Sequence, residues 1–309
     1  MINLLLLPEL REMLANDDQL ELQQFCTALN PARTAEFMEG LTNAEAWAVL
    51  RATDVSRRAE IFQYFDHERQ IAILSEEDPA EVALLIAELY ADDRVDLLQE
   101  MDEDRVNLLL ELLPKSDRRD IQRLQAYPEG TAGSLMTTEM AKLEEHLTVR
   151  EALNELSRLS EQLETIYYIY VVNKDEQLRG IVSGRQLISS LGKSHVSLAD
   201  LMATDVATVT VTDDREDVAQ KVERYDLLAI PVIDESGRLV GIITHDDVID
   251  VVREELIEDV QMIGGMAPLR EEYLRIGLML LSWKRHLANY AVLYCTFDRI
   301  RIKALQSST

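Results

Sequence analysis

Residues 1 to about 130 carry short runs of apolar residues at the three- and four-residue spacing of an amphipathic helix. Two such runs are Ile61, Phe62, Phe65 and Val82, Leu85, Ile86, Leu89. Helix-start signals separate the runs: Asp78 before Pro79, Asp92-Asp93, Asp102-Glu103-Asp104 and Ser116-Asp117. Since each run is too short to bury its apolar face alone, the pattern predicts an all-α domain of short helices stacked as a superhelix.

A different pattern begins at Leu135 and continues to about Val252. Runs rich in Val and Ile, at 166–172, 206–211 and 230–233, alternate with helical patterns at 149–159 and 217–225. Such alternation predicts buried strands between helices, and therefore an α/β part. The connection at 127–134 contains Pro128, Gly130 and Gly133, which is typical of a linker.

The α/β part contains the same unit twice. Each copy is expected to run strand, helix, strand, hairpin turn, strand and helix. At an offset of 61 residues, Gly180 matches Gly241 and Ser183 matches Thr244, whereas the starts Leu135-Met136 and Leu201-Met202 are 66 residues apart. The repeat predicts two domains, residues 135–196 and 197–252, followed by an acidic connecting helix at 246–264.

The acidic helix gathers its carboxylates on one side. On a helical wheel, Asp247, Asp250, Glu254 and Glu258 fall within roughly 80° of one another, given about 100° per residue. In the sequence only Arg253 and the mostly neutral His245 oppose these acids. Like charges at i,i+4 destabilise a helix by about 0.2–0.5 kcal/mol per pair. The stripe is therefore either a plain solvated face or a place where a cation binds.

Charge and composition narrow the function classes. The 309 residues carry 57 acids against 31 bases, a formal charge of -26, which repels nucleic acid and attracts cations. The five histidines have no metal-ligand spacing, and the sequence contains neither a Gly-x-Ser-x-Gly elbow nor a phosphate-cradling Gly-rich loop. We therefore expect that the chain is not an enzyme.

Among the cations that carboxylates bind, magnesium keeps several of its waters and takes only one or two carboxylate ligands. This preference suits shallow sites at the boundaries between domains, where each surface contributes one or two acids.

Two sets of motifs carry a family resemblance. The signature Gly-x-x-Ser/Thr-x-x-Asp at the end of a repeated β-α-β-β-α unit resembles a pair of cystathionine-β-synthase (CBS) domains, which dimerise and often bind adenine nucleotides. Over about 280 residues the chain resembles the cytosolic part of the MgtE family of magnesium channels. The motifs are Ala132-Gly-Ser-Leu-Met136, the run Glu164 to Val172, Gly237-Arg-Leu-Val-Gly241, Asp246-Asp-Val248 and Glu258-Asp259.

The resemblance implies an architecture and a set of sites. It implies a multidomain chain with an α-helical N domain at 1–130, the CBS pair, and a plug-like helix that leads to a pore. The implied Mg²⁺ ligands are Glu60, Asp92, Asp96, Glu216, Asp226, Asp247, Asp250, Glu255, Glu258 and Asp259, with a backbone oxygen at Ser134. From the sequence alone, plain solvated charges are the favoured interpretation of these acids, and only the resemblance favours metal ligands.

An adenine nucleotide such as ATP is the second ligand that the resemblance implies. Ser183 and Thr244 are the motif hydroxyls that would face phosphate, Asp247 would bind the ribose, and Tyr170 is either a base-stacking or a packing residue. Copy one has Gln186 where the motif acid stands, so its site lacks that charge.

The segment 265–309 departs from the family pattern. Its longest charge-free stretches, 276–283 and 287–297, are split by Lys284-Arg285-His286 and are too short to span a bilayer. We expect an amphipathic basic tail in place of the pore, and a truncated or frame-shifted channel gene and a true soluble sensor both remain open.

The sequence therefore favours the magnesium-sensing, gating part of an MgtE-like channel, dimeric through its CBS domains, at the cytoplasmic side of the membrane. Bound Mg²⁺ would stabilise the closed state. The alternative is a free-standing CBS module that senses adenine nucleotides and regulates a partner protein.

Overall fold

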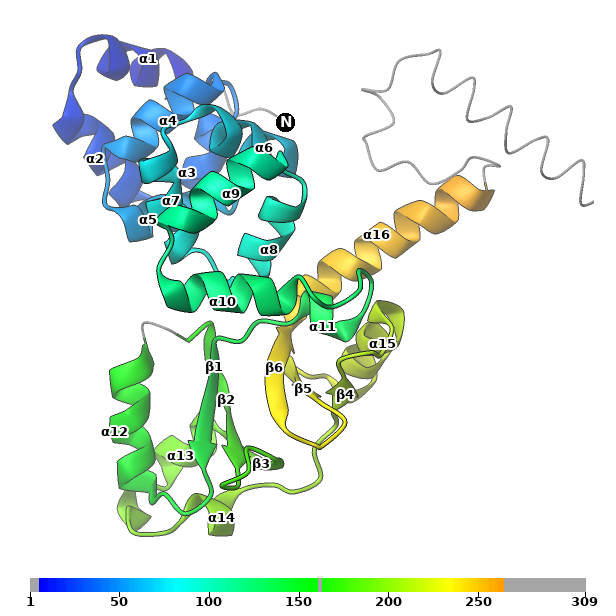
Figure 1. Cartoon of the computed structure of the whole chain (residues 1–309). Helices are drawn as coiled ribbons and strands as arrows, with labels where there is room; N and C mark the ends of the chain where they lie inside the picture. Colours follow the sequence, from blue (N-terminus) through cyan, green and yellow to red (C-terminus); the bar gives the residue numbers. More distant parts are fainter. Residues whose placement is uncertain (1–5, 161–162, 264–309) are drawn as a thin grey trace, which may run out of the picture. The chain divides into compact units, whose positions relative to one another are not determined.

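The computed structural model describes residues 6–160 and 163–263, with side chains of the last helix described as far as Ile257. The predicted tail at 265–309 lies outside these residues. The chain forms two compact units, one built from residues 1–214 and 228–244 and the other from 215–227 and 245 onward. The predicted fold class, an all-α N domain followed by an α/β part, is confirmed (Figure 1).

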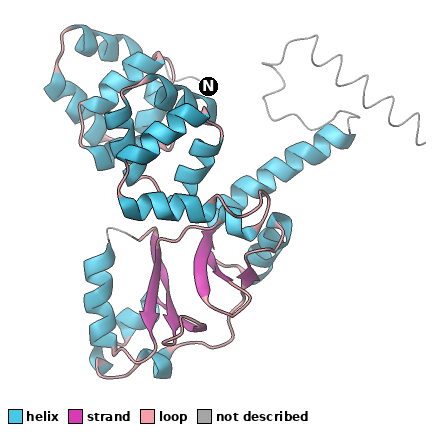
Figure 2. Ribbon diagram, viewed as in Figure 1, coloured by secondary structure: helices cyan, strands magenta, loops and turns pink. Residues whose placement is uncertain are grey.

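Residues 7–124 of the first unit form ten short helices with no strand among them (Figure 2). They are α1 (Leu7–Ala15), α2 (Gln19–Ala28), α3 (Pro31–Met38), α4 (Asn43–Arg51), α5 (Val55–Phe62), α6 (His67–Glu76), α7 (Pro79–Glu88), α8 (Ala91–Gln99), α9 (Glu103–Leu112) and α10 (Lys115–Leu124). Each helix begins twelve residues after the previous one, from Leu7 to Lys115. The N domain is thus a twelve-residue repeat with one helix in each unit.

Capping side chains mark most of the repeat boundaries. The residue before the helix is Asp, Asn or Thr at α2 to α7 and at α9. Asp18, Asn30, Thr42, Asp54, Asp78 and Asp102 accept hydrogen bonds from the backbone of the helix that follows. These bonds satisfy amide groups that the first helical turn leaves without partners. At α8 the repeat departs from this rule, because Tyr90 holds the cap position and makes no capping bond.

The third residue of several helices binds the end of the helix three units earlier. Arg69 donates to the carbonyls of Met38 (3.1 Å) and Leu41 (2.8 Å). Arg57 and Arg105 bind carbonyls at the same sequence separations, 31 and 28 residues back. Where the third residue of a helix is acidic, it contacts a side chain 30 residues earlier in the sequence. Glu81 forms an ion pair with Arg51, and Asp93 accepts a hydrogen bond from Gln63. The carbonyls at a helix C-terminus attract a guanidinium, so these contacts fix the superhelical spacing.

Two three-stranded sheets follow the helical domain. The first contains β1 (Met140–Glu144), β2 (Thr165–Val172) and β3 (Leu178–Ser183), and the second β4 (Val209–Thr210), β5 (Ala229–Ile233) and β6 (Leu239–Thr244). In each sheet the first strand pair is parallel and the second antiparallel. Gly180 pairs with Val171 and Gly241 with Val232, so the registers agree with the predicted offset of 61 residues.

The remaining described helices connect or flank these strands. They are α11 (Ala132–Leu135), α12 (Val149–Leu159), α13 (Gly184–Ser189), a short 3-10 turn at Leu191–Lys193, α14 (Leu198–Leu201), α15 (Arg215–Tyr225) and α16 (His245–Ile263). Apolar residues of α12 and α13 pack on the first sheet around Ile169 and Val182. Tyr170 and Val172 pack against Ala229 and Ile242, which joins the two sheets. In the second unit, α15 packs against α16.

The Leu-Met start of each copy packs on the sheet of the other copy. Thr137 exchanges backbone hydrogen bonds with Ile242, and Ala203 does so with Ile181. A Cβ at Gly241 would lie 2.7 Å from the carbonyl oxygen of Thr137, and one at Gly180 would lie 2.5 Å from that of Ala203. The two motif glycines therefore allow the exchanged segments to approach the sheets.

We expect Gly241→Ala to destabilise the chain by about 2 kcal/mol, because overpacking against backbone atoms leaves little room for relaxation. Gly192→Ala is the matched control, since a Cβ there meets no atom within 4 Å. Urea denaturation measures both free energies of unfolding. Equal stabilities for the two variants would contradict the packing role of Gly241.

Candidate metal site

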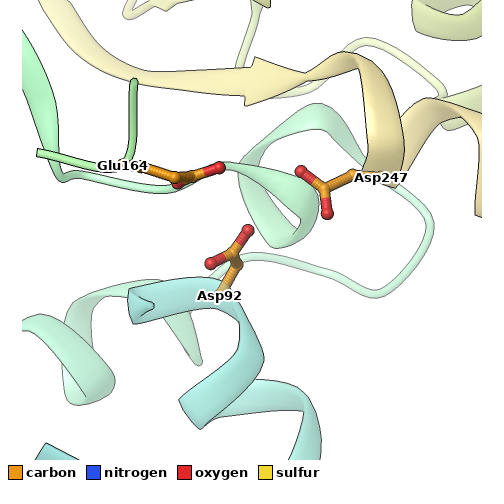
Figure 3. A group of neighbouring side chains, drawn as sticks. All are labelled: Asp92, Glu164 and Asp247. Carbon is orange, nitrogen blue, oxygen red and sulfur yellow. The ribbon is translucent and has the colours of Figure 1, made fainter. Parts of the chain in front are cut away.

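Asp92, Glu164 and Asp247 form a group of acidic side chains that can hold a metal ion (Figure 3). One carboxylate oxygen from each lies within 4.8 Å of those of the other two. Asp92 is buried and the other two are half-buried. Two unit charges at about this separation repel by roughly 3 kcal/mol at an effective dielectric constant near 20. A hard divalent cation with oxygen ligands removes this repulsion and suits the donor set.

Asp92 stands at the second position of α8, two residues after Tyr90, which occupies the cap position. Asp92 and Asp93 thus place two acids in the first turn of the one helix among α2 to α9 whose cap residue is neither Asp, Asn nor Thr. Carboxylates at a helix N-terminus are favoured by the helix dipole. Asp96 follows one turn later and is exposed.

Glu164 precedes β2 and is held by its backbone. Its N–H donates to the carbonyl of Glu139 at 2.9 Å. The Glu139 side chain in turn accepts a hydrogen bond from Arg94, two residues after Asp92, at 3.0 Å. Burial raises the pKa of the Glu139 carboxyl, while Arg94 acts in the opposite direction. An ion pair and a backbone bond therefore connect α8 to the segment that carries Glu164, all within the first unit.

Asp247 follows β6 by three residues and lies in the first turn of α16. The end of β6 belongs to the first unit and is bonded to Thr137. Thr137 is two residues before Glu139, so the strand that leads to Asp247 is tied to the same segment as Arg94 and Glu164.

Several other predicted ligands have nearby cations as partners. Glu60 is exposed and pairs with Arg57 at 2.7 Å, and Asp250 pairs with Arg253 at 3.0 Å. Arg215 at the start of α15 pairs with Glu254 (3.0 Å) and Glu255 (2.6 Å). The expectation that only Arg253 and His245 oppose the acidic helix is therefore wrong, because α15 packs beside it and brings Arg215 to its acids.

The remaining predicted metal ligands lie apart from this group or outside the described part. Glu216 and Asp226 are exposed at the two ends of α15, and Asp226 has a left-handed backbone, with φ of 51°. The Ser134 hydroxyl donates to the Thr131 carbonyl at 2.9 Å. The side chains of Glu258 and Asp259 lie outside the described residues.

The predicted nucleotide-binding residues have the following surroundings. Tyr170 is 1% exposed, and its hydroxyl has no hydrogen-bond partner among the described residues. Ser183 caps α13, and Gln186 reaches back to both the amide and the hydroxyl of Ser183. Gln186 therefore closes a capping box in the place where the motif acid would stand. Thr244 is buried at the end of β6.

Sequence reasoning missed Glu164, Glu139, Arg94 and Arg215. Glu164 opened a family motif but carried no pattern that indicates a ligand. Arg94 does carry a signal, since it is the single base between Asp92, Asp93 and Asp96. Glu139 and Arg215 meet their partners only through tertiary contacts over 45 and 39 residues.

Known proteins share both parts of this architecture. A family model described as the MgtE intracellular N domain matches residues 29–130, and the CBS domain model matches residues 132–193 and 198–254. A crystal structure of the soluble part of a magnesium transporter is 34% identical, with a TM-score of 0.74, and the match covers 80% of this chain and 97% of that one. The chain belongs to the MgtE family.

Other MgtE relatives agree with this assignment. The cytosolic domain of the Mg²⁺ channel MgtE in complex with ATP is 34% identical, with a TM-score of 0.73, over 78% of this chain and 98% of that chain. The magnesium transporter MgtE of Bacillus subtilis is 42% identical over 150 residues, which are 48% of this chain and 33% of that protein. The match thus spans about a third of the length of that curated relative. None of the described helices is long and apolar enough to cross a membrane.

We expect Asp92→Asn to raise the free energy of unfolding in EDTA by about 1 kcal/mol, because it removes one charge from the repelling group. Magnesium at a hundred times its Kd should stabilise the wild type by about 2.7 kcal/mol per site, and the variant by much less. Urea denaturation with EDTA and with Mg²⁺ measures both effects.

Asp205→Asn is the matched control, because Asp205 is an exposed acid outside the group. An equal magnesium-dependent stabilisation of wild type and Asp92→Asn would exclude Asp92 as a ligand.

Proposed function

We propose that this chain is the magnesium-sensing, gating part of an MgtE-like magnesium transporter. The observation that carries the proposal is the proximity of the Asp92 and Glu164 carboxylates, both in the first unit, in a chain of the MgtE family. Its role is to bind and regulate, and it includes no catalysis. The proposed partner is a transmembrane pore, with this chain at the cytoplasmic side of the membrane.

The proposed mechanism is linkage between ion binding and conformation. Without a cation, repulsion among the carboxylates favours separation of the segments that carry them. Mg²⁺ binds the state in which they converge better than the separated state and stabilises it by RT ln(1 + [L]/Kd). One site at a hundred times its Kd supplies about 2.7 kcal/mol, so a few weak sites suffice for a switch. In the transporter the converged state is the closed one.

The other acids implied by the family resemblance fit this mechanism as accessory ligands. Asp96 is exposed on α8, one turn after Asp92, and Asp250 is exposed on α16, close to Asp247 in sequence. Glu60, Glu216, Asp226 and Glu255, and in sequence Glu258 and Asp259, complete the proposed set. Acids that form an ion pair with an arginine, such as Glu255 with Arg215, must give up that pair to bind Mg²⁺. These acids are therefore expected to be the weaker Mg²⁺ ligands.

Adenine-nucleotide sensing is the second candidate function. It is supported by the ATP complex of a 34% identical cytosolic MgtE domain. Thr244, Ser183, Tyr170 and Asp247 are the residues proposed for it. The engagement of Ser183 with Gln186 argues against a full site in copy one.

Titration calorimetry of the whole chain distinguishes the two functions. We expect heat from millimolar Mg²⁺ that Asp92→Asn abolishes and Asp205→Asn preserves. Tight binding of ATP or AMP with no response to millimolar Mg²⁺ would support the nucleotide sensor and contradict the magnesium sensor.

We also propose that the chain is a homodimer through its CBS domains. Both copies expose apolar residues at equivalent positions: Ile188 and Leu191 after the first sheet, Ile249 and Val252 after the second. These residues are 44–62% exposed. Ile249 and Val252 belong to the apolar side of the acidic helix. Because both are exposed, this side is available to contact a second copy of the chain. A two-fold dimer buries equivalent patches on each subunit.

We expect the double variant Ile188→Asp, Ile249→Asp to be monomeric by light scattering, because it places four charges in the proposed interface of each dimer. Leu108→Asp is the control, since Leu108 is an exposed apolar residue of α9 in the N domain. A dimer that survives the double substitution would place the interface elsewhere.

A further inference from the structure

Arg94 is a buried cation two residues after Asp92. Its side chain is 8% exposed in the ion pair with Glu139, whose side chain is 23% exposed. One guanidinium nitrogen, Nη2, donates both to Glu139 Oε1 and to the carbonyl of Ala87 at the end of α7, each at 3.0 Å. The pair differs from a surface pair such as Arg158 with Glu155, whose side chains are 73% and 38% exposed. Breaking a buried pair costs far more than breaking an exposed one.

The ion pair joins the same two segments that carry Asp92 and Glu164. Asp92 and Arg94 share the first turns of α8, and the backbone of Glu139 accepts the hydrogen bond from the Glu164 amide. Glu139 is also anchored from the other side, because Thr137 exchanges two backbone bonds with Ile242 of β6. Arg94 therefore connects α8 to the residue whose backbone holds Glu164.

Two opposing forces act between these segments. The carboxylates of Asp92 and Glu164 repel, whereas the Arg94 guanidinium attracts the Glu139 carboxylate. The attraction is present with or without a bound ion, and the repulsion disappears when a cation binds between the acids.

We propose that Arg94 is a positioning residue of the magnesium site, which holds Asp92 close to Glu164 before the ion arrives and so sets the magnesium concentration of the switch. The inference rests on the proposed function. If only a fraction of the molecules has the acids converged, the apparent Kd is the intrinsic Kd divided by that fraction. Loss of Arg94 lowers the fraction and raises the apparent Kd.

Titration of the whole chain with MgCl₂ in a calorimeter tests this role. We expect Arg94→Met to raise the apparent Kd by about fivefold or more. Arg94→Lys should have an intermediate value, because the ammonium keeps the charge but not the planar donor fork. Arg158→Met removes an arginine from a surface ion pair and should match the wild type.

The opposite outcome has a clear physical meaning. If Arg94 merely repels the incoming cation, Arg94→Met would bind Mg²⁺ as tightly as the wild type or more tightly, and that result would overturn the proposal.

A double-mutant cycle with Glu139 tests whether Arg94 acts through this partner. Glu139→Gln keeps the volume and an acceptor for Arg94 but removes the charge. We expect it to raise the apparent Kd in the wild-type background and to have little further effect in Arg94→Met. Fully additive effects would contradict the coupling. If Arg94→Met does not fold, Glu139→Gln and Arg94→Lys with their double variant still decide the question.

Asp92→Asn separates this inference from the proposed function. If Asp92→Asn abolishes the magnesium heat while Arg94→Met and Arg94→Lys bind as the wild type does, only the positioning role fails. If Asp92→Asn binds Mg²⁺ as the wild type does, the proposed site itself fails.

Discussion

The balance of charge around the first turns of α8 is the interaction on which the rest of the account depends. Asp92 repels Glu164, and two residues later Arg94 attracts Glu139, whose backbone holds Glu164. Attraction and repulsion thus act between the same two segments, and a divalent cation bound by the carboxylates would change their balance. That property is what a concentration sensor requires.

The twelve-residue repeat explains how α8 comes to present these charges. Arginines at the third position of α5, α6 and α9 bind helices three units earlier, and an Asp, Asn or Thr precedes most of the ten helices. The arginine contacts position α5, α6 and α9 on α2, α3 and α6 and include no residue of α8. The sequence of α8 can therefore differ from that of the other repeats. Tyr90 replaces the usual capping residue, and Asp92 and Asp93 lie inside the first turn. Departures from a local rule are expected where function replaces stability.

Much of this architecture could be predicted from the sequence, and the missing parts have physical causes. The apolar spacing predicted the short helices, and the Val and Ile runs predicted strands. The offset between Gly180 and Gly241 in the sequence matches the equivalent strand pairing of these two glycines in the two sheets. Asp92 and Asp247 came from the family resemblance. Glu164 and Arg94 were missed because their roles arise from contacts between distant segments, as with Arg94 and Glu139 over 45 residues. The capping residues from Asp18 to Asp102 already show the twelve-residue period of the N domain in the sequence. The period becomes clear, however, only when the first residues of the helices are known.

The most direct test of the central claim is small-angle X-ray scattering of the whole chain in EDTA and in saturating Mg²⁺. We expect a smaller radius of gyration in Mg²⁺, because the ion removes the repulsion among the carboxylates of Asp92, Glu164 and Asp247. The same radius of gyration in both conditions would contradict it.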